Sequence, residues 1–156
     1  MEKILKLVLI ISVFMTLAGC KKEPDPVGIA GEWKLESING VPAENMAADE
    51  YGGLDIYISF SDDGKFETFQ RISGGEHYYR FSGTYTRAGR DVVSGIYSDG
   101  NSWAADYTVA RESDRLTMTG GDDTCVYVSA SIPDDVRDSA IEVKSGQDCG
   151  SGFRFL

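Results

Sequence analysis

Hydrophobic and polar residues alternate along most of the chain after residue 30. From Leu54 to Phe60, for example, an apolar residue occupies every second position. A period of two is typical of a β-strand with one buried face. The same alternation predicts eight strands, over residues 31–38, 54–60, 65–72, 79–86, 92–97, 103–109, 116–118 and 124–129. Turns rich in glycine, aspartate and asparagine separate these segments, so the pattern predicts an antiparallel meander.

Three other segments carry weaker patterns. A short helix is predicted after Pro133, where two aspartates precede an apolar stripe formed by Val136, Ala140, Ile141 and Val143, and Gly146 ends it. Residues 152–156 are predicted to form a final edge strand. The connection over residues 41–53 has room for one helical turn and suits a flap over one end of a barrel, with a disordered surface loop as the alternative.

The first twenty residues have the three parts of a secretory signal. Lys3 and Lys6 give a positive start, an apolar stretch runs from residue 7 to residue 17, and small residues precede Cys20. The ending Leu17-Ala18-Gly19-Cys20 resembles the lipobox of bacterial lipoproteins, in which the peptide is cut before a cysteine that carries lipid. We therefore expect a signal peptide over residues 1–19, a lipidated Cys20 with a flexible tether over residues 20–30, and one domain over residues 31–156.

The same segment allows two alternatives to this anchor. A transmembrane helix is disfavoured because the apolar stretch is shorter than the ~20 residues that span a bilayer. An ordinary secretory signal with a chance cysteine stays open.

In Gram-negative sorting, aspartate after the lipidated cysteine favours retention at the inner membrane, and residue 21 is lysine. The resemblance therefore implies an outer-membrane location, with the protein facing the periplasm or the cell surface.

The charge of the chain and its cysteines limit the kinds of partner and bond to be expected. The formal net charge of −10 argues against nucleic acid, because the chain offers no basic patch to neutralise phosphates. We expect a monomer whose membrane contact is the lipid on Cys20. Export places Cys125 and Cys149 where disulfides persist, and a bridge between them is allowed but not required.

Several stretches together resemble lipocalin-like lipoproteins of Gram-negative anaerobes. They are Gly31-Glu32-Trp33-Lys34-Leu35, the segment 60–66, Tyr79-Arg80-Phe81-Ser82-Gly83-Thr84-Tyr85, the segment 95–100 and Ser131-Ile132-Pro133. The resemblance implies an up-and-down antiparallel barrel of about eight strands. It also implies that Trp33 packs under a cationic side chain from the last strand, for which Arg154 is the candidate.

The barrel interior is the predicted binding site. If one strand face points inward, its aromatic and apolar residues line a small-molecule site, namely Ile56, Phe66, Phe81, Tyr85, Trp103 and Tyr107. The alternative is that these residues are simply the core, because an eight-stranded barrel is only just wide enough for one small ligand. A second hypothesis is a surface module that contacts a protein or glycan, for which exposed Tyr57, Phe69 and Tyr78 would supply the contact surface.

Nothing in the sequence predicts catalysis. His77 is the single histidine, and neither Cys125 nor Cys149 has a histidine in a local motif. The acidic pairs at residues 62–63, 122–123 and 134–135 lack the spacing of a calcium loop. We therefore expect no enzyme activity, no metal and no cofactor.

Overall fold

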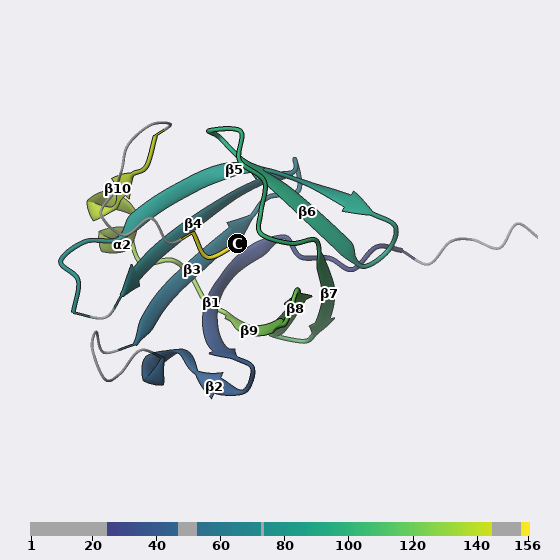
Figure 1. The fold of residues 1–156 in the computed structure, drawn as a ribbon, viewed down its shortest axis with the longest axis horizontal. Coiled ribbons are helices and arrows are strands. Elements are labelled where there is room, and N and C mark those ends of the chain that lie inside the picture. Colours follow the sequence, from purple (N-terminus) through teal and green to yellow (C-terminus); the bar gives the residue numbers. More distant parts are fainter. Residues whose placement is uncertain (1–24, 47–52, 73, 145–153) are drawn as a thin grey trace, which may run out of the picture.

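The computed structural model describes residues 25–46, 53–72, 74–144 and 154–156, and the predictions for residues 1–24 and for Cys149 lie outside this part. Eight antiparallel strands close into a barrel (Figure 1), as predicted. They are β1 (Gly31–Ile38), β3 (Leu54–Phe60), β4 (Lys65–Ile72), β5 (Tyr79–Ala88), β6 (Val92–Tyr97), β7 (Tyr107–Glu112), β8 (Arg115–Gly120) and β9 (Asp123–Ser129). Each strand from β3 to β9 pairs with its neighbours along the chain, and β1 closes the ring between β9 and β3.

One predicted strand begins later than expected. The pattern predicted a strand from residue 103, but β7 starts at Tyr107, and Trp103 lies in the connection after β6. The pairing between β6 and β7 is short, with Val92 opposite Thr108 and Val93 opposite Tyr107. The alternation of Trp103 and Ala105 therefore reflects a connection that turns one large side chain inward, not a strand.

The predicted C-terminal helix is also shorter than expected. The helix α2 (Asp134–Ser139) gives way at once to β10 (Ile141–Glu142), which pairs in parallel with the first residues of β5. One edge of β5 pairs with β4, and the other pairs with β6 only from Gly83 onward, so the first residues of β5 leave that second edge open. Pairing with that edge satisfies backbone groups that a longer helix would leave unpaired on β5.

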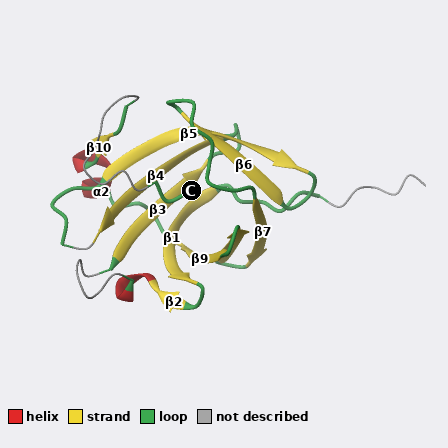
Figure 2. Ribbon diagram, in the orientation of Figure 1, coloured by secondary structure: helices red, strands yellow, loops and turns green. Residues whose placement is uncertain are grey.

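The remaining described segments cover the two ends of the barrel. The connection after β1 forms the predicted helical turn, η2 (Ala43–Asn45), and also the short strand β2 (Val41–Pro42), which was not predicted; Ala43 joins the core. Residues 154–156 are not a strand, which corrects the predicted final edge strand. Figure 2 shows how short the helical segments are beside the sheet.

The barrel, its core and the coverings of its ends all lie within residues 27–156. A chain that begins at Lys21 therefore contains every described strand and helix and every described core residue. Among the described residues, no helix is both long enough and apolar enough to cross a bilayer.

Candidate functional site

One end of the barrel is closed by the residues that precede β1. Ile29 is fully buried, and its carbonyl oxygen accepts a hydrogen bond of 2.9 Å from Trp33 Nε1. Arg111 of β7 donates to the Gly28 carbonyl oxygen at 3.1 Å, and its guanidinium lies 5.0 Å from the centre of the Trp33 ring. The sequence assigned residues 20–30 to a flexible tether, and the structure shows that the last of them are part of the barrel.

The predicted contact between Trp33 and Arg154 is wrong. The Arg154 guanidinium lies 4.9 Å from the centre of the Tyr97 ring and pairs with Asp99, on the turn that follows β6. The cation over Trp33 is Arg111 instead. The prediction failed because it placed Arg154 on a last strand beside β1, whereas residues 154–156 leave the sheet and enter the opposite end of the barrel.

All six residues predicted to line the interior are buried in the main core cluster, namely Ile56, Phe66, Phe81, Tyr85, Trp103 and Tyr107. Their rings pack edge to face: the centre of the Trp103 ring lies 5.0 Å from that of Phe66 and 5.9 Å from that of Tyr107. These residues are thus brought together inside the barrel, where they pack on one another as a core does.

Two of these large rings, Trp103 and Tyr107, fit in the interior because each packs directly against a glycine, which has no side chain. An added Cβ atom at Gly95 of β6 would lie 2.2 Å from Trp103 Cε2. At Gly120 of β8 it would lie 2.7 Å from Tyr107 Cδ1. Sequence reasoning did not identify either glycine as a packing site, although a glycine inside a strand is the usual mark of such a contact.

The interior also carries polar groups that stay uncharged. Burial raises the pKa of Tyr107 to about 12 and that of the Cys125 thiol to about 11, and it raises the pKa values of Tyr97 and Tyr127 well above their usual range. Trp103 Nε1 is buried and finds no hydrogen-bond partner in the described part of the chain, and the Tyr127 hydroxyl lies beside the Cys125 thiol. A neutral interior with a buried donor at Trp103 suits an apolar ligand that carries a polar atom.

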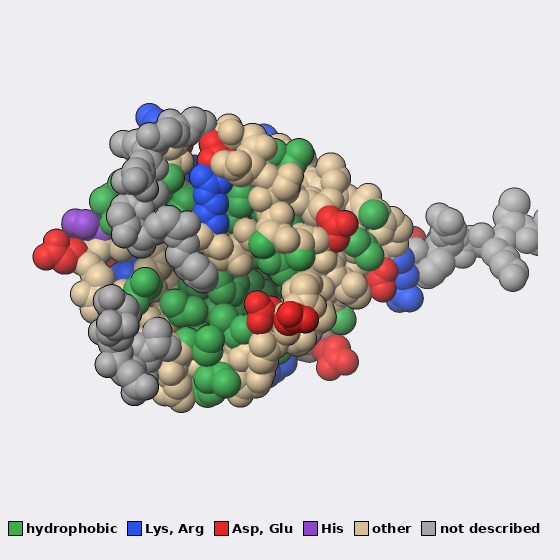
Figure 3. Space-filling model, in the orientation of Figure 1, with side chains coloured by type: hydrophobic (Ala, Val, Ile, Leu, Met, Phe, Trp, Pro, Cys, Tyr) green, Lys and Arg blue, Asp and Glu red, His purple; other side chains and the backbone are tan. Residues whose placement is uncertain are grey.

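The opposite end of the barrel is hollowed. At the centre of Figure 3, hydrophobic side chains line a hollow in the face on which Figure 1 marks the last residue. Leu156 is buried there, with 2 % of its surface exposed. Among the described residues, access to the interior is therefore from this end, here termed the open end, since residues 27–30 cover the other.

The groups that could support chemistry are dispersed. Cys125 is a free, buried thiol and Cys149 lies outside the described residues, so a bridge between the two, which the sequence allows but does not require, gains no support. His77 is exposed, and its nearest charged partner is the neighbouring Glu76 at 3.9 Å. Within the described ranges, no three histidine, cysteine, aspartate or glutamate side chains gather as a metal site would require.

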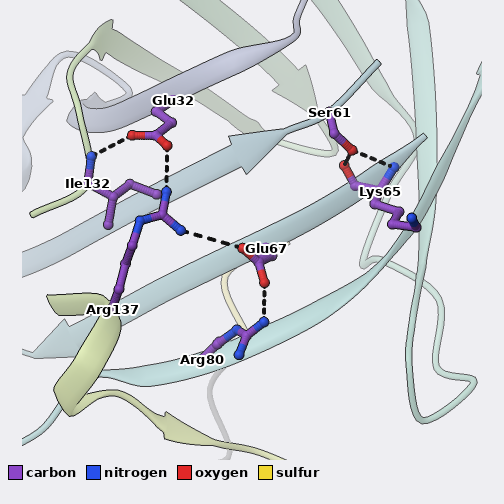
Figure 4. Close-up of polar contacts among 7 residues, drawn as sticks. All are labelled: Glu32, Ser61, Lys65, Glu67, Arg80, Ile132 and Arg137. Carbon is purple, nitrogen blue, oxygen red and sulfur yellow. Dashed lines mark hydrogen bonds and ion pairs between the residues drawn. The ribbon is translucent and has the colours of Figure 1, made fainter. Parts of the chain in front are cut away.

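An ion-pair network fixes α2 on the outer wall of the barrel (Figure 4). Arg137 of α2 lies 2.5 Å from a carboxylate oxygen of Glu32 and 3.7 Å from one of Glu67, and Glu67 also pairs with Arg80. The other Glu32 oxygen accepts a hydrogen bond of 2.7 Å from the Ile132 amide. These contacts join the segment after β9 to β1, β4 and β5.

The predicted exposed aromatic patch does not exist. Tyr57, Phe69 and Tyr78 are buried under α2, where they pack with Ile132 and Val136 in a second hydrophobic cluster. The prediction was wrong because strand alternation places these residues on the outer face, and only the returning helix covers it. The surface-module hypothesis therefore loses the contact surface on which it rested.

A separate groove of about 630 Å³ runs over the outer face of β3 to β6. Its lining is rich in hydroxyl-bearing and charged residues, including Ser59, Ser61, Lys65, Glu67, Arg80, Ser82, Thr84 and Ser98. The Ser61 hydroxyl and the backbone of Lys65 are hydrogen-bonded to each other across the β3–β4 turn (Figure 4). Charged and hydroxyl-bearing side chains are therefore more frequent along this groove than in the barrel interior.

Comparison with known proteins gives one match. The family model described as a lipocalin-like domain matches residues 29–118, which is more than half of the chain. No curated protein and no solved structure matches the chain. The match begins at Ile29, the residue that closes the barrel, and ends within β8.

Proposed function

Because the chain belongs to the lipocalin-like domain family, we propose that it is a non-catalytic binding protein that takes a small hydrophobic ligand into the open end of its barrel. The observation that carries this proposal is the interior itself: it is aromatic, neutral and covered at one end, and among the described residues the Trp103 Nε1 donor has no hydrogen-bond partner. An eight-stranded barrel of this kind has space for at most one small ligand.

The test is a titration with N-phenyl-1-naphthylamine, an uncharged fluorophore that matches the neutral interior. A chain that begins at Lys21 should bind it saturably, one molecule per chain, with a rise in probe fluorescence. Energy transfer from tryptophan should accompany binding because Trp103 lies inside the barrel. Fluorescence that rises without saturating would contradict the proposal.

Two matched variants locate the site. Ile38 is buried on β1 near the open end, and Ile96 is 52 % exposed on the outer wall. We expect Ile38→Trp to narrow the entrance and weaken probe binding by about tenfold, or about 1.4 kcal/mol. The same enlargement at Ile96 should leave the affinity unchanged. Equal effects of the two variants would place the probe outside the barrel.

We propose further that the protein is a lipoprotein of the outer membrane, monomeric and anchored through Cys20. The lipobox-like ending and Lys21 support this, and multiple acyl chains would hold the protein firmly. Radiolabelled palmitate should be incorporated by the unmodified chain and not by Cys20→Ser, and only the former should sediment with outer membranes. Labelling of both forms, or of neither, would contradict the anchor.

A further inference from the structure

The last three residues of the sequence occupy the open end of the barrel as a ligand would. The Leu156 amide donates to the Tyr97 hydroxyl oxygen at 3.2 Å, and that hydroxyl donates to the Leu156 carbonyl oxygen at 2.8 Å. The Phe155 amide donates to Gln70 Oε1 at 3.2 Å. Tyr97 and Gln70 are themselves 4 % and 6 % exposed, so these are contacts with the interior and not with the rim.

Apolar contacts complete the fit. The Phe155 ring lies edge to face with Tyr127, with 6.5 Å between the ring centres, and Leu156 belongs to the main core cluster. Tyr127 is fully buried, and its hydroxyl lies beside the Cys125 thiol. Phe155 and Leu156 therefore make both polar and apolar contacts with buried residues of the barrel.

A clamp outside the barrel holds the segment in place. Both terminal nitrogens of Arg154 contact the Asp99 carboxylate, one of them at 3.1 Å. The pair is partly buried, with 27 % of the Arg154 side chain and 10 % of the Asp99 side chain exposed. The guanidinium also lies over the Tyr97 ring. A bidentate pair of this kind fixes the direction in which residues 155 and 156 enter the barrel.

We propose that residues 154–156 are a built-in occupant of the binding site, and that the ligand is an apolar molecule with a carbonyl or amide group that displaces Phe155 and Leu156 and takes over the hydrogen bonds to Tyr97. This inference rests on the proposed binding function. The chemical class of the ligand follows from the hydrogen bonds that it must replace. A purely apolar molecule would leave the Tyr97 hydroxyl buried without a partner, whereas a carbonyl or amide group restores the hydrogen bond that Leu156 makes with it.

The first test compares two probes on the chain that begins at Lys21. Oleamide, an apolar chain that ends in a primary amide, offers an oxygen and an N–H in place of those of Leu156, whereas N-phenyl-1-naphthylamine has no oxygen to offer. Asp99→Asn releases the clamp and should tighten oleamide binding by about fivefold or more, because the fraction of molecules with a free site rises. Asp106→Asn, an exposed residue of the same connection, is the matched control and should change nothing. Tyr97→Phe should lower the preference for oleamide over the naphthylamine.

The second test needs no variant. The Phe155 and Leu156 amides should exchange their hydrogens slowly in the free protein and rapidly when oleamide is bound, as followed by nuclear magnetic resonance. If the probes bind while these amides stay protected and Asp99→Asn has no effect, the built-in occupant is refuted and the binding function stands. If neither probe binds the unmodified chain or Asp99→Asn, both proposals fail. Oleamide binding to Asp99→Asn alone supports the built-in occupant, whereas the binding function stands only if the unmodified chain binds the naphthylamine.

Discussion

Replacing Ile29 with alanine should destabilise the barrel strongly, although Ile29 precedes every strand. Its side chain is fully buried against the closed end. The segment is held there by Arg87, which donates to the Val27 carbonyl oxygen at 2.6 Å, and by Trp33, which donates to Ile29. A flexible tether would have none of these contacts.

The magnitude follows from what the substitution removes. Ile→Ala deletes three carbon atoms, each worth about 0.8 kcal/mol when buried, or about 2.4 kcal/mol together. The cavity left behind adds to this, so we expect a loss of about 3 kcal/mol in the free energy of unfolding, within the usual range of about 2–5 kcal/mol. In a domain of this size that loss lowers the melting temperature by roughly 10 °C.

The assay is urea denaturation of the chain that begins at Lys21, followed by circular dichroism. Ile96→Ala is the control: Ile96 is 52 % exposed, so the same deletion should cost less than about 0.5 kcal/mol. If Ile29→Ala is as mild as this control, residues 27–30 do not close the barrel in solution, and the closed end of the proposed site is lost with them.

Three further predictions concern the core. Gly95→Ala should cost about 1–3 kcal/mol and shift tryptophan emission, because the new methyl group must displace Trp103, whose ring atoms lie as close as 2.2 Å. Arg111→Met should cost about 1 kcal/mol by loss of the cation over Trp33, and an unchanged urea midpoint would contradict that role. Burial raises the pKa of Cys125 from 9.0 to about 11, so the unfolded chain releases this proton first. Stability should hold below pH 9 and fall as the pH rises toward 11, which urea midpoints measured across this range would show; Cys125→Ala should lessen the fall.

The strand pattern of this protein is a local property, and it could be predicted from the sequence for that reason. A strand with one buried face alternates along its own length, so residues 54–60 identify β3 and the turn that follows without reference to other parts of the chain. The same alternation correctly placed Phe66 and Phe81 in the interior, because the face of a strand is set by residue parity.

The segments that cover the outer wall and the two ends of the barrel come from distant parts of the sequence, so only the tertiary structure shows which surface each of them buries. Alternation places Phe69 on the outer wall, but α2 arrives some sixty-five residues later to bury it. Ile29 lacks any periodic pattern, and Trp103 shares the period of a strand without belonging to one. Leu156 enters the barrel because Tyr97 offers its amide and carbonyl a partner there. Such contacts depend on where the closed barrel leaves apolar surface and unpaired polar groups, which no local pattern records.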